Sequence, residues 1–127
     1  MIIGTGIDLI EIGRIKEAAQ SKAFLERVFT EPEMAFFKSK NFNPQSIAGL
    51  FAAKEAVSKA FGLGIGDISW QDIIIGHDEN GAPQVCFSKT CCQMIAGKYG
   101  TIQVHLSITH SKTDAAAFAI VERADER

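Results

Sequence analysis

The segment from Asn43 to Gly62 constrains the fold of this chain more than any other. Asn43-Pro44 is a strong helix start, because an asparagine cap followed by proline in the first turn suits a helix N-terminus. Gly62 is the matching stop signal. Between them, apolar residues recur at helical spacing, and frequent alanines leave room for close packing. The segment therefore predicts one long helix, ending at Phe61, around which other elements pack.

The rest of the chain alternates between strand and helix patterns. Strands are predicted where β-branched and apolar residues gather: Ile2–Leu9, Ile73–Gly76, Gln84–Phe87, Ile102–Thr109 and Ala115–Glu122. Shorter helices are predicted to follow Glu11, Ser21, Thr30 and Ser88. The Asn80-Gly81 pair marks a hairpin. We expect a single domain over residues 1–127 with an α+β fold, in which a mainly antiparallel sheet packs with one long and several short helices.

Composition narrows the possible functions. The chain has 127 residues, 46% of them hydrophobic, and its net charge of -2 lacks the basic surplus of a general nucleic-acid binder. Its three cysteines, Cys86, Cys91 and Cys92, have no paired zinc spacing, so reduced thiols are expected. No apolar stretch reaches the roughly 20 residues of a membrane span, and the N-terminus lacks a signal-peptide pattern. We therefore expect a cytoplasmic protein without membrane or nucleic-acid partners.

Asp8 is an acidic residue inside an otherwise apolar predicted strand. Alternation along the strand puts it on the face that holds Gly4 and Gly6. A buried carboxylate is costly unless it is paired, hydrogen-bonded or bound to a metal, and the glycines leave room for another group to come close. Two interpretations stay open: Asp8 is a functional carboxylate, or it ends the strand and caps the helix that begins near Glu11.

Glu55 and Lys59 form a second candidate pair. Their i,i+4 spacing places them on one face of the long helix, among small alanines that permit a ligand or another element to approach. The simpler interpretation of this spacing is a solvated ion pair worth about 0.3 kcal/mol. The other interpretation is a functional pair.

The polar turn His110-Ser111-Lys112-Thr113 is the third candidate. Its donors lie at the end of a predicted strand and suit phosphate oxygens, although hairpin turns are commonly this polar. His77 and His105 are assigned to structure, because the histidines have no zinc spacing. With Asp8 and Glu55, the turn suggests a divalent cation and a phosphorylated ligand. Both Mg²⁺ and Mn²⁺ accept such oxygen ligands.

Three motifs follow one another in a specific order. They are Gly6-Ile7-Asp8-Leu9, the stretch Phe51–Ala56 with Lys59–Gly62, and Leu106-Ser107-Ile108-Thr109-His110-Ser111. The match also includes Arg27–Glu33 and Asp78–Pro83, and so covers nearly the whole chain. In this pattern the chain resembles the small bacterial 4′-phosphopantetheinyl transferases, the holo-[acyl-carrier-protein] synthase family.

The resemblance implies a reaction in which the 4′-phosphopantetheine arm of coenzyme A moves to a serine of apo acyl carrier protein. Adenosine 3′,5′-bisphosphate is released, and the product supports fatty acid biosynthesis. The resemblance further implies that Asp8 and Glu55 bind Mg²⁺, which holds the diphosphate of coenzyme A. Lys59 would neutralise or protonate the leaving phosphate, and a carboxylate or a water that it orients would take the serine proton.

The resemblance also implies residues that bind coenzyme A. Those expected at the nucleotide end or its border are His110, Ser111, Gly62 and Gly64. Leu50 departs from the family pattern, because many members have arginine there. Lys54 or another cation is the expected replacement for that phosphate contact; the alternative is a different affinity for coenzyme A.

A homotrimer, with each active site between neighbouring subunits, is implied as well. The acidic carrier protein would dock on the early helices, where Arg14, Lys22 and Arg27 supply complementary charge. Two other classes stay open: a non-catalytic module that binds a nucleotide or a carrier protein, and a purely structural trimer-forming protein. Two carboxylates together with a lysine favour the enzyme, because simple binding does not need all three.

Overall fold

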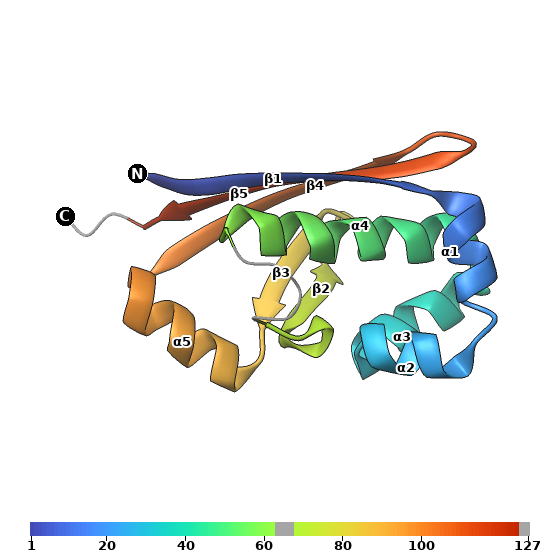
Figure 1. Cartoon of the computed structure of the whole chain (residues 1–127), viewed down its shortest axis with the longest axis horizontal. Helices are drawn as coiled ribbons and strands as arrows, with labels where there is room; N and C mark the ends of the chain where they lie inside the picture. The colour runs from blue at the N-terminus through green and yellow to red at the C-terminus, as the bar shows by residue number, and fades with distance from the viewer. Residues whose placement is uncertain (63–67, 125–127) are drawn as a thin grey trace.

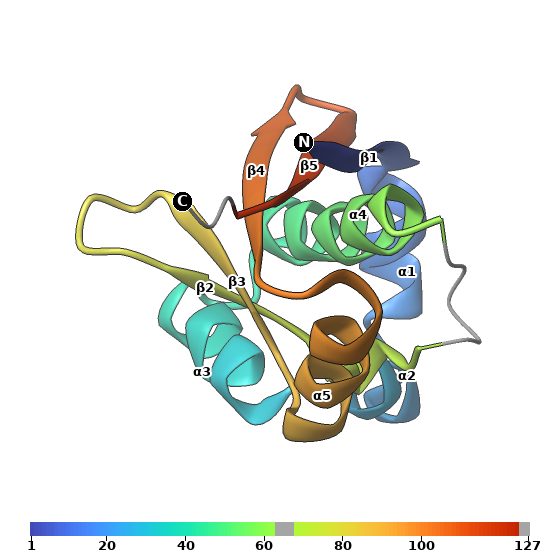
Figure 2. The same cartoon turned by 90° about the vertical axis from the view of Figure 1, so that its left-hand side faces the viewer.

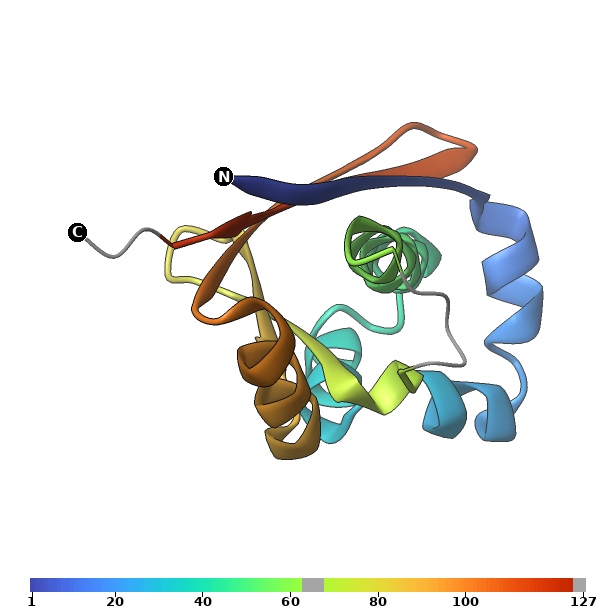
Figure 3. The same cartoon turned by 60° about the vertical axis from the view of Figure 1, so that its left-hand side comes forward.

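The long predicted helix is confirmed as α4 (Pro44–Ala60) in the computed structural model, which describes residues 1–62 and 68–124. The Asn43 side chain accepts a hydrogen bond from the Gln45 N–H at 2.8 Å, and Gly62 follows the helix with a φ of 73°. Most of α4 from Ile47 onward is buried. Figure 3 looks along this helix and shows strands above it and other elements below it. The helix is thus the centre of the fold.

A three-stranded antiparallel sheet covers one side of α4 (Figure 1, Figure 2). Its order is β1 (Ile2–Glu11), β5 (Asp114–Arg123) and β4 (Ile102–His110), so the first strand pairs with the last. In the strand register, Asp8 of β1 pairs with Ala117 of β5. Ala117 pairs on its other side with Ile108 of β4. The first and last strands of the chain, together with β4, therefore form the surface against which α4 packs.

The two remaining strands form a separate hairpin. β2 (Ile73–His77) follows the short 3-10 helix η1 (Trp70–Asp72) and pairs with β3 (Pro83–Phe87). Asp78 closes the turn by accepting hydrogen bonds from the N–H groups of Asn80 and Ala82. The predicted strands are confirmed, but the antiparallel strands divide into two sheets instead of one.

The shorter helices lie at the two ends of the molecule (Figure 1). α1 (Ile12–Ala18), α2 (Lys22–Val28) and α3 (Glu31–Ser39) follow β1, and α5 (Lys89–Tyr99) connects the two sheets. Ser21 and Ser88 cap α2 and α5 through their hydroxyl oxygens, as their positions predict. None of the helices in the described ranges has the length and apolar character that crossing a bilayer requires.

Candidate active site

Asp8 lies within β1, and its side chain meets α4. The alternative that Asp8 caps the next helix is wrong, because β1 continues to Glu11 and α1 begins without a side-chain cap. The N–H of Ile12 instead donates to the Thr113 carbonyl at 2.9 Å. Asp8 is therefore a carboxylate held in the middle of a strand, with a side chain that is 14% exposed.

Gly4 and Gly6 allow β1 to approach α4 closely. A Cβ at Gly4 would overlap the carbonyl oxygen of Ala60, and one at Gly6 would overlap that of Ala56. Glycine is required here because no side chain fits between the two backbones. The prediction that the glycines admit a close neighbour is confirmed, and the neighbour is the C-terminal half of α4.

Lys59 crosses this contact from α4 to β1. Its Nζ lies 3.2 Å from Asp8 Oδ1 and 3.1 Å from the carbonyl oxygen of Ile7. The lysine side chain is 50% exposed, so its ammonium can also face a ligand that approaches from solvent. Lys59 thus pairs with an acid on another element, and the interpretation of a solvated pair within one helix does not describe it.

Glu55 lies one turn before Lys59 and is half-buried. Burial raises the pKa of the Glu55 carboxyl, the nearby Asp8 carboxylate raises it further, and Lys59 lowers it. The effect of Asp8 on Glu55 indicates that the two acids are close enough to interact electrostatically. When both acids are ionised, the two carboxylates and one ammonium leave a net negative charge, which favours the binding of a cation.

The donor set of this region fits Mg²⁺. Mg²⁺ is commonly held by one or two protein carboxylates and completes its octahedron with water and phosphate oxygens. In the ranges 1–62 and 68–124, no group of three or more His, Cys, Asp or Glu side chains is placed to hold a metal. The two acids would therefore need oxygen ligands from a substrate or from water, as expected for a metal that binds with a phosphorylated ligand.

Lys54 does not have the predicted role of a phosphate contact. Its side chain is fully buried, and its Nζ donates to Glu33 Oε1 at 2.7 Å, Trp70 O at 2.8 Å and Ile73 O at 2.7 Å. These acceptors use all three N–H bonds of the ammonium, so none is left for a ligand. Burial lowers the pKa of Lys54, against the opposing effect of the Glu33 carboxylate. The sequence feature that could have indicated this burial is the position of Lys54 among alanines on a helix that is mostly buried.

His110 lies at the end of β4, and β5 separates this strand from β1, which carries Asp8. His110 borders a hollow of about 410 Å³, and Leu50 lines the same hollow. Three further residues there were not predicted: Lys40, Phe36 and His77. The Phe36 and His77 rings stack at 4.3 Å, and Lys40 Nζ lies 5.8 Å from the Phe36 ring centre. This hollow combines a cation with aromatic rings, and its described lining does not include Asp8, Glu55 or Lys59.

Ser111 shapes the turn between β4 and β5. Its Oγ accepts hydrogen bonds from the N–H groups of Thr113 and Asp114. Gly62 ends α4 in the left-handed region, as its predicted stop position requires. Gly64 lies outside the described residues.

The three basic residues expected to meet a partner lie on neighbouring short helices. Arg14 is exposed on α1, and Lys22 and Arg27 are exposed on α2. Lys22 lies 3.8 Å from Glu26, and Arg27 lies over the Phe24 ring at 6.0 Å. Figure 1 shows both helices at the end of the molecule where β1 ends.

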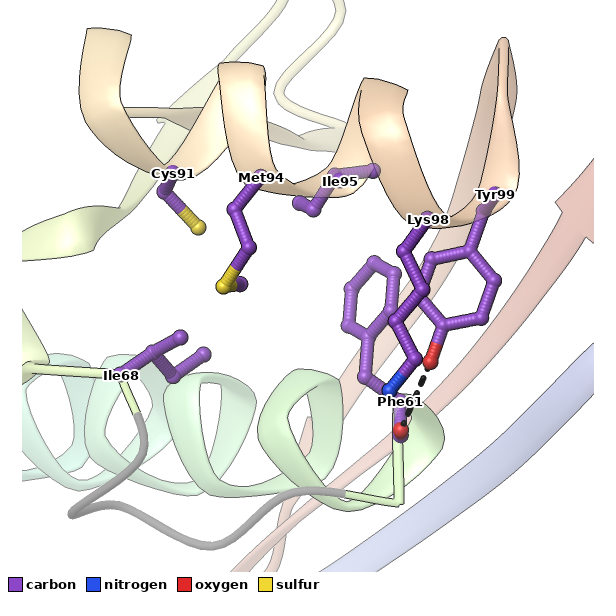
Figure 4. A pocket seen from close by; sticks show the side chains of 7 residues that line it. All are labelled: Phe61, Ile68, Cys91, Met94, Ile95, Lys98 and Tyr99. Atoms are coloured by element: carbon purple, nitrogen blue, oxygen red, sulfur yellow. Dashed lines mark hydrogen bonds between the residues drawn. The ribbon is translucent and has the colours of Figure 1, made fainter.

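Another hollow, of about 340 Å³, lies between α5 and the end of α4 (Figure 4). Its described lining is mainly apolar, and Lys98 and Tyr99 lie at one end. The Tyr99 hydroxyl donates to the Phe61 carbonyl at 3.4 Å. No carboxylate is among its described lining residues, so it does not compete with the Asp8 region as a metal site.

Known proteins match this chain over almost its whole length. The model of the 4′-phosphopantetheinyl transferase superfamily matches residues 4–121. A holo-[acyl-carrier-protein] synthase from Clostridium perfringens (strain 13 / Type A) is 45% identical over 126 residues, covering 96% of this chain and 95% of that protein. One from Thermoanaerobacter sp. (strain X514) is 48% identical over 122 residues, covering 94% and 87%.

Solved structures agree with the fold described above. A holo-(acyl-carrier-protein) synthase from Bacillus anthracis, in complex with CoA (3′,5′-ADP), has a TM-score of 0.81 and 38% identity, covering 98% of this chain and 99% of its own. One from Neisseria meningitidis has a TM-score of 0.89 and 33% identity, covering 96% and 99%. This chain therefore belongs to the 4′-phosphopantetheinyl transferase superfamily and is a transferase of the holo-[acyl-carrier-protein] synthase type.

Proposed function

We propose that this chain transfers the 4′-phosphopantetheine group of coenzyme A to a serine of apo acyl carrier protein, in support of fatty acid biosynthesis. One observation carries the proposal: where β1 packs on α4, Lys59 pairs with Asp8 and lies one helical turn from Glu55, whose pKa the Asp8 carboxylate raises. Relatives from Bacillus anthracis and Helicobacter pylori were solved with coenzyme A or its nucleotide part, which supports coenzyme A as the donor.

In this mechanism, each side chain has a distinct part. Asp8 and Glu55 would hold Mg²⁺, which would act as a Lewis acid on the phosphoryl oxygens. The serine oxygen forms a bond to phosphorus while the bond to the leaving adenosine 3′,5′-bisphosphate breaks. A carboxylate of the pair, or a water that it orients, accepts the serine proton. Lys59, with half of its side chain exposed, neutralises or protonates the leaving phosphate.

The active form in this proposal is a homotrimer. On the side of the sheet away from α4, Ile7 is 65% exposed, Leu9 is 69% exposed and Phe118 is 41% exposed. An apolar surface of this kind is typical of an interface. Because Asp8, Glu55 and Lys59 are not among the described residues that line the hollow at His110, we infer that a neighbouring subunit that covers the sheet supplies the nucleotide-binding residues.

The acidic carrier protein is proposed to dock on α1 and α2. The side chains of Arg14, Lys22 and Arg27 are exposed there and supply positive charge despite the acidic total. Arg14→Glu should slow association with the carrier and leave coenzyme A binding unchanged. Lys89→Glu makes the same change of charge at an exposed position on α5, outside the proposed docking helices, and is the matched control. Equal loss of both kinds of binding would point to misfolding.

The cytoplasm is the proposed location of the reaction. Cys86, Cys91 and Cys92 are all free thiols, which fits a reducing compartment. Fractionation of cells that express the tagged chain, with markers for each compartment, tests this assignment.

Mass spectrometry of the carrier tests the central proposal. Mixing the chain with coenzyme A, Mg²⁺ and apo carrier should add about 340 Da to the carrier, the mass of the group moved in the phosphoryl transfer. EDTA should stop the reaction, and Asp8→Ala and Glu55→Ala should each abolish it while the fold persists. An unmodified carrier, with coenzyme A or the carrier still bound, would favour the non-catalytic binding module instead.

A further inference from the structure

Glu33 and Lys54 form an ion pair that is completely enclosed by the protein. Lys54 Nζ lies 2.7 Å from Glu33 Oε1, and both side chains are 0% exposed. The carboxylate also accepts hydrogen bonds from the N–H groups of Thr30 at 2.8 Å and Ile75 at 2.7 Å. The pair therefore joins α3, α4 and β2 at one point in the interior, away from the exposed side of the proposed catalytic site.

Stability alone does not explain a pair of this kind. Removing two charges from water costs about as much as their attraction returns, and apolar side chains of similar volume often stabilise an interior as well. The charged pair instead fixes the relative orientation of the elements that it joins, because each hydrogen-bond donor and acceptor has a defined partner. Lys54 uses every N–H of its ammonium on three partners from other elements.

On its opposite side, α4 packs closely against β1. Gly4 and Gly6 contact the carbonyl oxygens of Ala60 and Ala56, so backbone meets backbone. Such a contact sets how near the helix lies to β1, but glycine has no side chain that would interlock with the helix. Lys59 also bonds to β1 from this side, but its side chain is 50% exposed. Lys54 is fully buried and donates to three acceptors, so we expect it to constrain the rotation of α4 about its axis more strongly.

Lys54 directly precedes Glu55, and neighbouring residues on a helix are about 100° apart around the axis. Anchoring Lys54 to α3 and β2 turns Glu55 and Lys59 toward Asp8 on β1. We infer that Lys54 and Glu33 are positioning residues that set the rotation of α4 and thereby the geometry of the Mg²⁺ site. This inference rests on the proposed function, because it concerns the metal site assigned there.

Variants that remove the pair test this inference. Lys54→Met keeps the length of the side chain but removes the charge, and Glu33→Gln with Lys54→Met leaves no unpaired charge in the interior. Lys38→Met, an exposed lysine on the same helix as Glu33, is the matched control. Mn²⁺ binding in the presence of coenzyme A is measured from the electron paramagnetic resonance signal of free Mn²⁺, on protein shown by circular dichroism to be folded.

Lys54→Met and the double variant should both bind Mn²⁺ at least tenfold more weakly than the unmodified chain. Both should also need at least tenfold more Mg²⁺ for half-maximal transfer, with an unchanged KM for the carrier. Lys38→Met should match the unmodified chain. If Lys54→Met does not fold, the double variant alone makes the comparison.

Wild-type Mn²⁺ affinity and Mg²⁺ requirement in a folded variant would overturn the inference, because a merely structural pair changes stability and not the metal site. The proposed function fails in a different way. In that case the unmodified chain would bind Mn²⁺ in the presence of coenzyme A but would leave the carrier unmodified. The comparison of Mn²⁺ affinity between the variants would still decide the role of Lys54.

Discussion

Lys59 on α4 and Asp8 on β1 are 51 residues apart in the chain, yet their Nζ and Oδ1 atoms lie 3.2 Å apart. The lysine also donates to the Ile7 carbonyl at 3.1 Å, so it is tied to the backbone that carries the acid. Because half of the lysine side chain is exposed, solvent screens the pair and limits its effect on stability. Its main effect is to hold a positive charge beside the two carboxylates.

Lys59→Met is expected to separate catalysis from stability. The free energy of unfolding should fall by about 1 kcal/mol or less, as for other partly exposed pairs. The kcat should fall by about 100-fold or more, because a charge that stabilises the leaving phosphate is lost. Urea denaturation and the rate of carrier modification measure the two effects. A variant that keeps the wild-type kcat would remove Lys59 from the mechanism.

Glu55→Gln is expected to stabilise the metal-free protein near neutral pH. Burial and the Asp8 carboxylate raise the pKa of Glu55 in the folded state. Such a group contributes most stability below its unfolded pKa of about 4.3, and this contribution is lost as pH rises through the raised folded pKa. The amide stays neutral at every pH and avoids that loss.

Thermal unfolding with EDTA present measures this effect. At about pH 7.5 the Tm of Glu55→Gln should exceed that of the unmodified chain by about 2 °C, which corresponds to roughly 0.5 kcal/mol. The difference should shrink as the pH falls through about 4, because the glutamate then becomes protonated in both the folded and the unfolded state. A Tm difference that is zero or negative at neutral pH would contradict the raised pKa of Glu55 in the folded state.

Gly6→Ala is expected to disrupt the contact between β1 and α4. The added methyl would overlap the Ala56 carbonyl oxygen, so the strand and the helix must separate. A loss of about 3 kcal/mol or more in unfolding free energy is expected. Gly97→Ala on α5 meets nothing within 4 Å and should gain about 0.5 kcal/mol from helix propensity. Urea denaturation of both variants makes the comparison.

Phe118→Glu is expected to weaken the proposed homotrimer. Phe118 lies opposite Ile7 in the sheet, and both are exposed on the face away from α4. A charge there would have to be buried at the interface, which is costly. Light scattering after size exclusion should show a lower mass for Phe118→Glu than for Gln93→Glu, an exposed control on α5. Equal masses would exclude this face from the interface.

The three thiols are expected to react at two different rates. Burial, with a smaller effect from Asp72, raises the pKa of Cys91 to about 11, so its thiol stays protonated near neutral pH. Cys86 and Cys92 are exposed. Iodoacetamide should therefore add two groups quickly and a third slowly, because the thiolate is the reactive form. Intact-mass spectra over time follow the additions, and three equal rates would contradict the burial of Cys91.

Local sequence signals determined the elements of the fold, because they act over a few residues. The Asn43-Pro44 start, the Gly62 stop and the serine caps predicted helices that the structure contains. Gly4 and Gly6 predicted a close neighbour but could not identify it, since α4 follows many residues later. Likewise, the sequence motifs indicated the chemistry of the family before any geometry was known.

Only the tertiary structure decided which side chains meet. Lys54 and Lys59 lie on one helix among similar alanines, yet one is enclosed with Glu33 and the other faces Asp8 and solvent. The difference depends on the rotation of α4 and on the pairing of the first strand with the last. Both are set by packing between segments that are distant in the chain, and no short stretch of sequence contains that information.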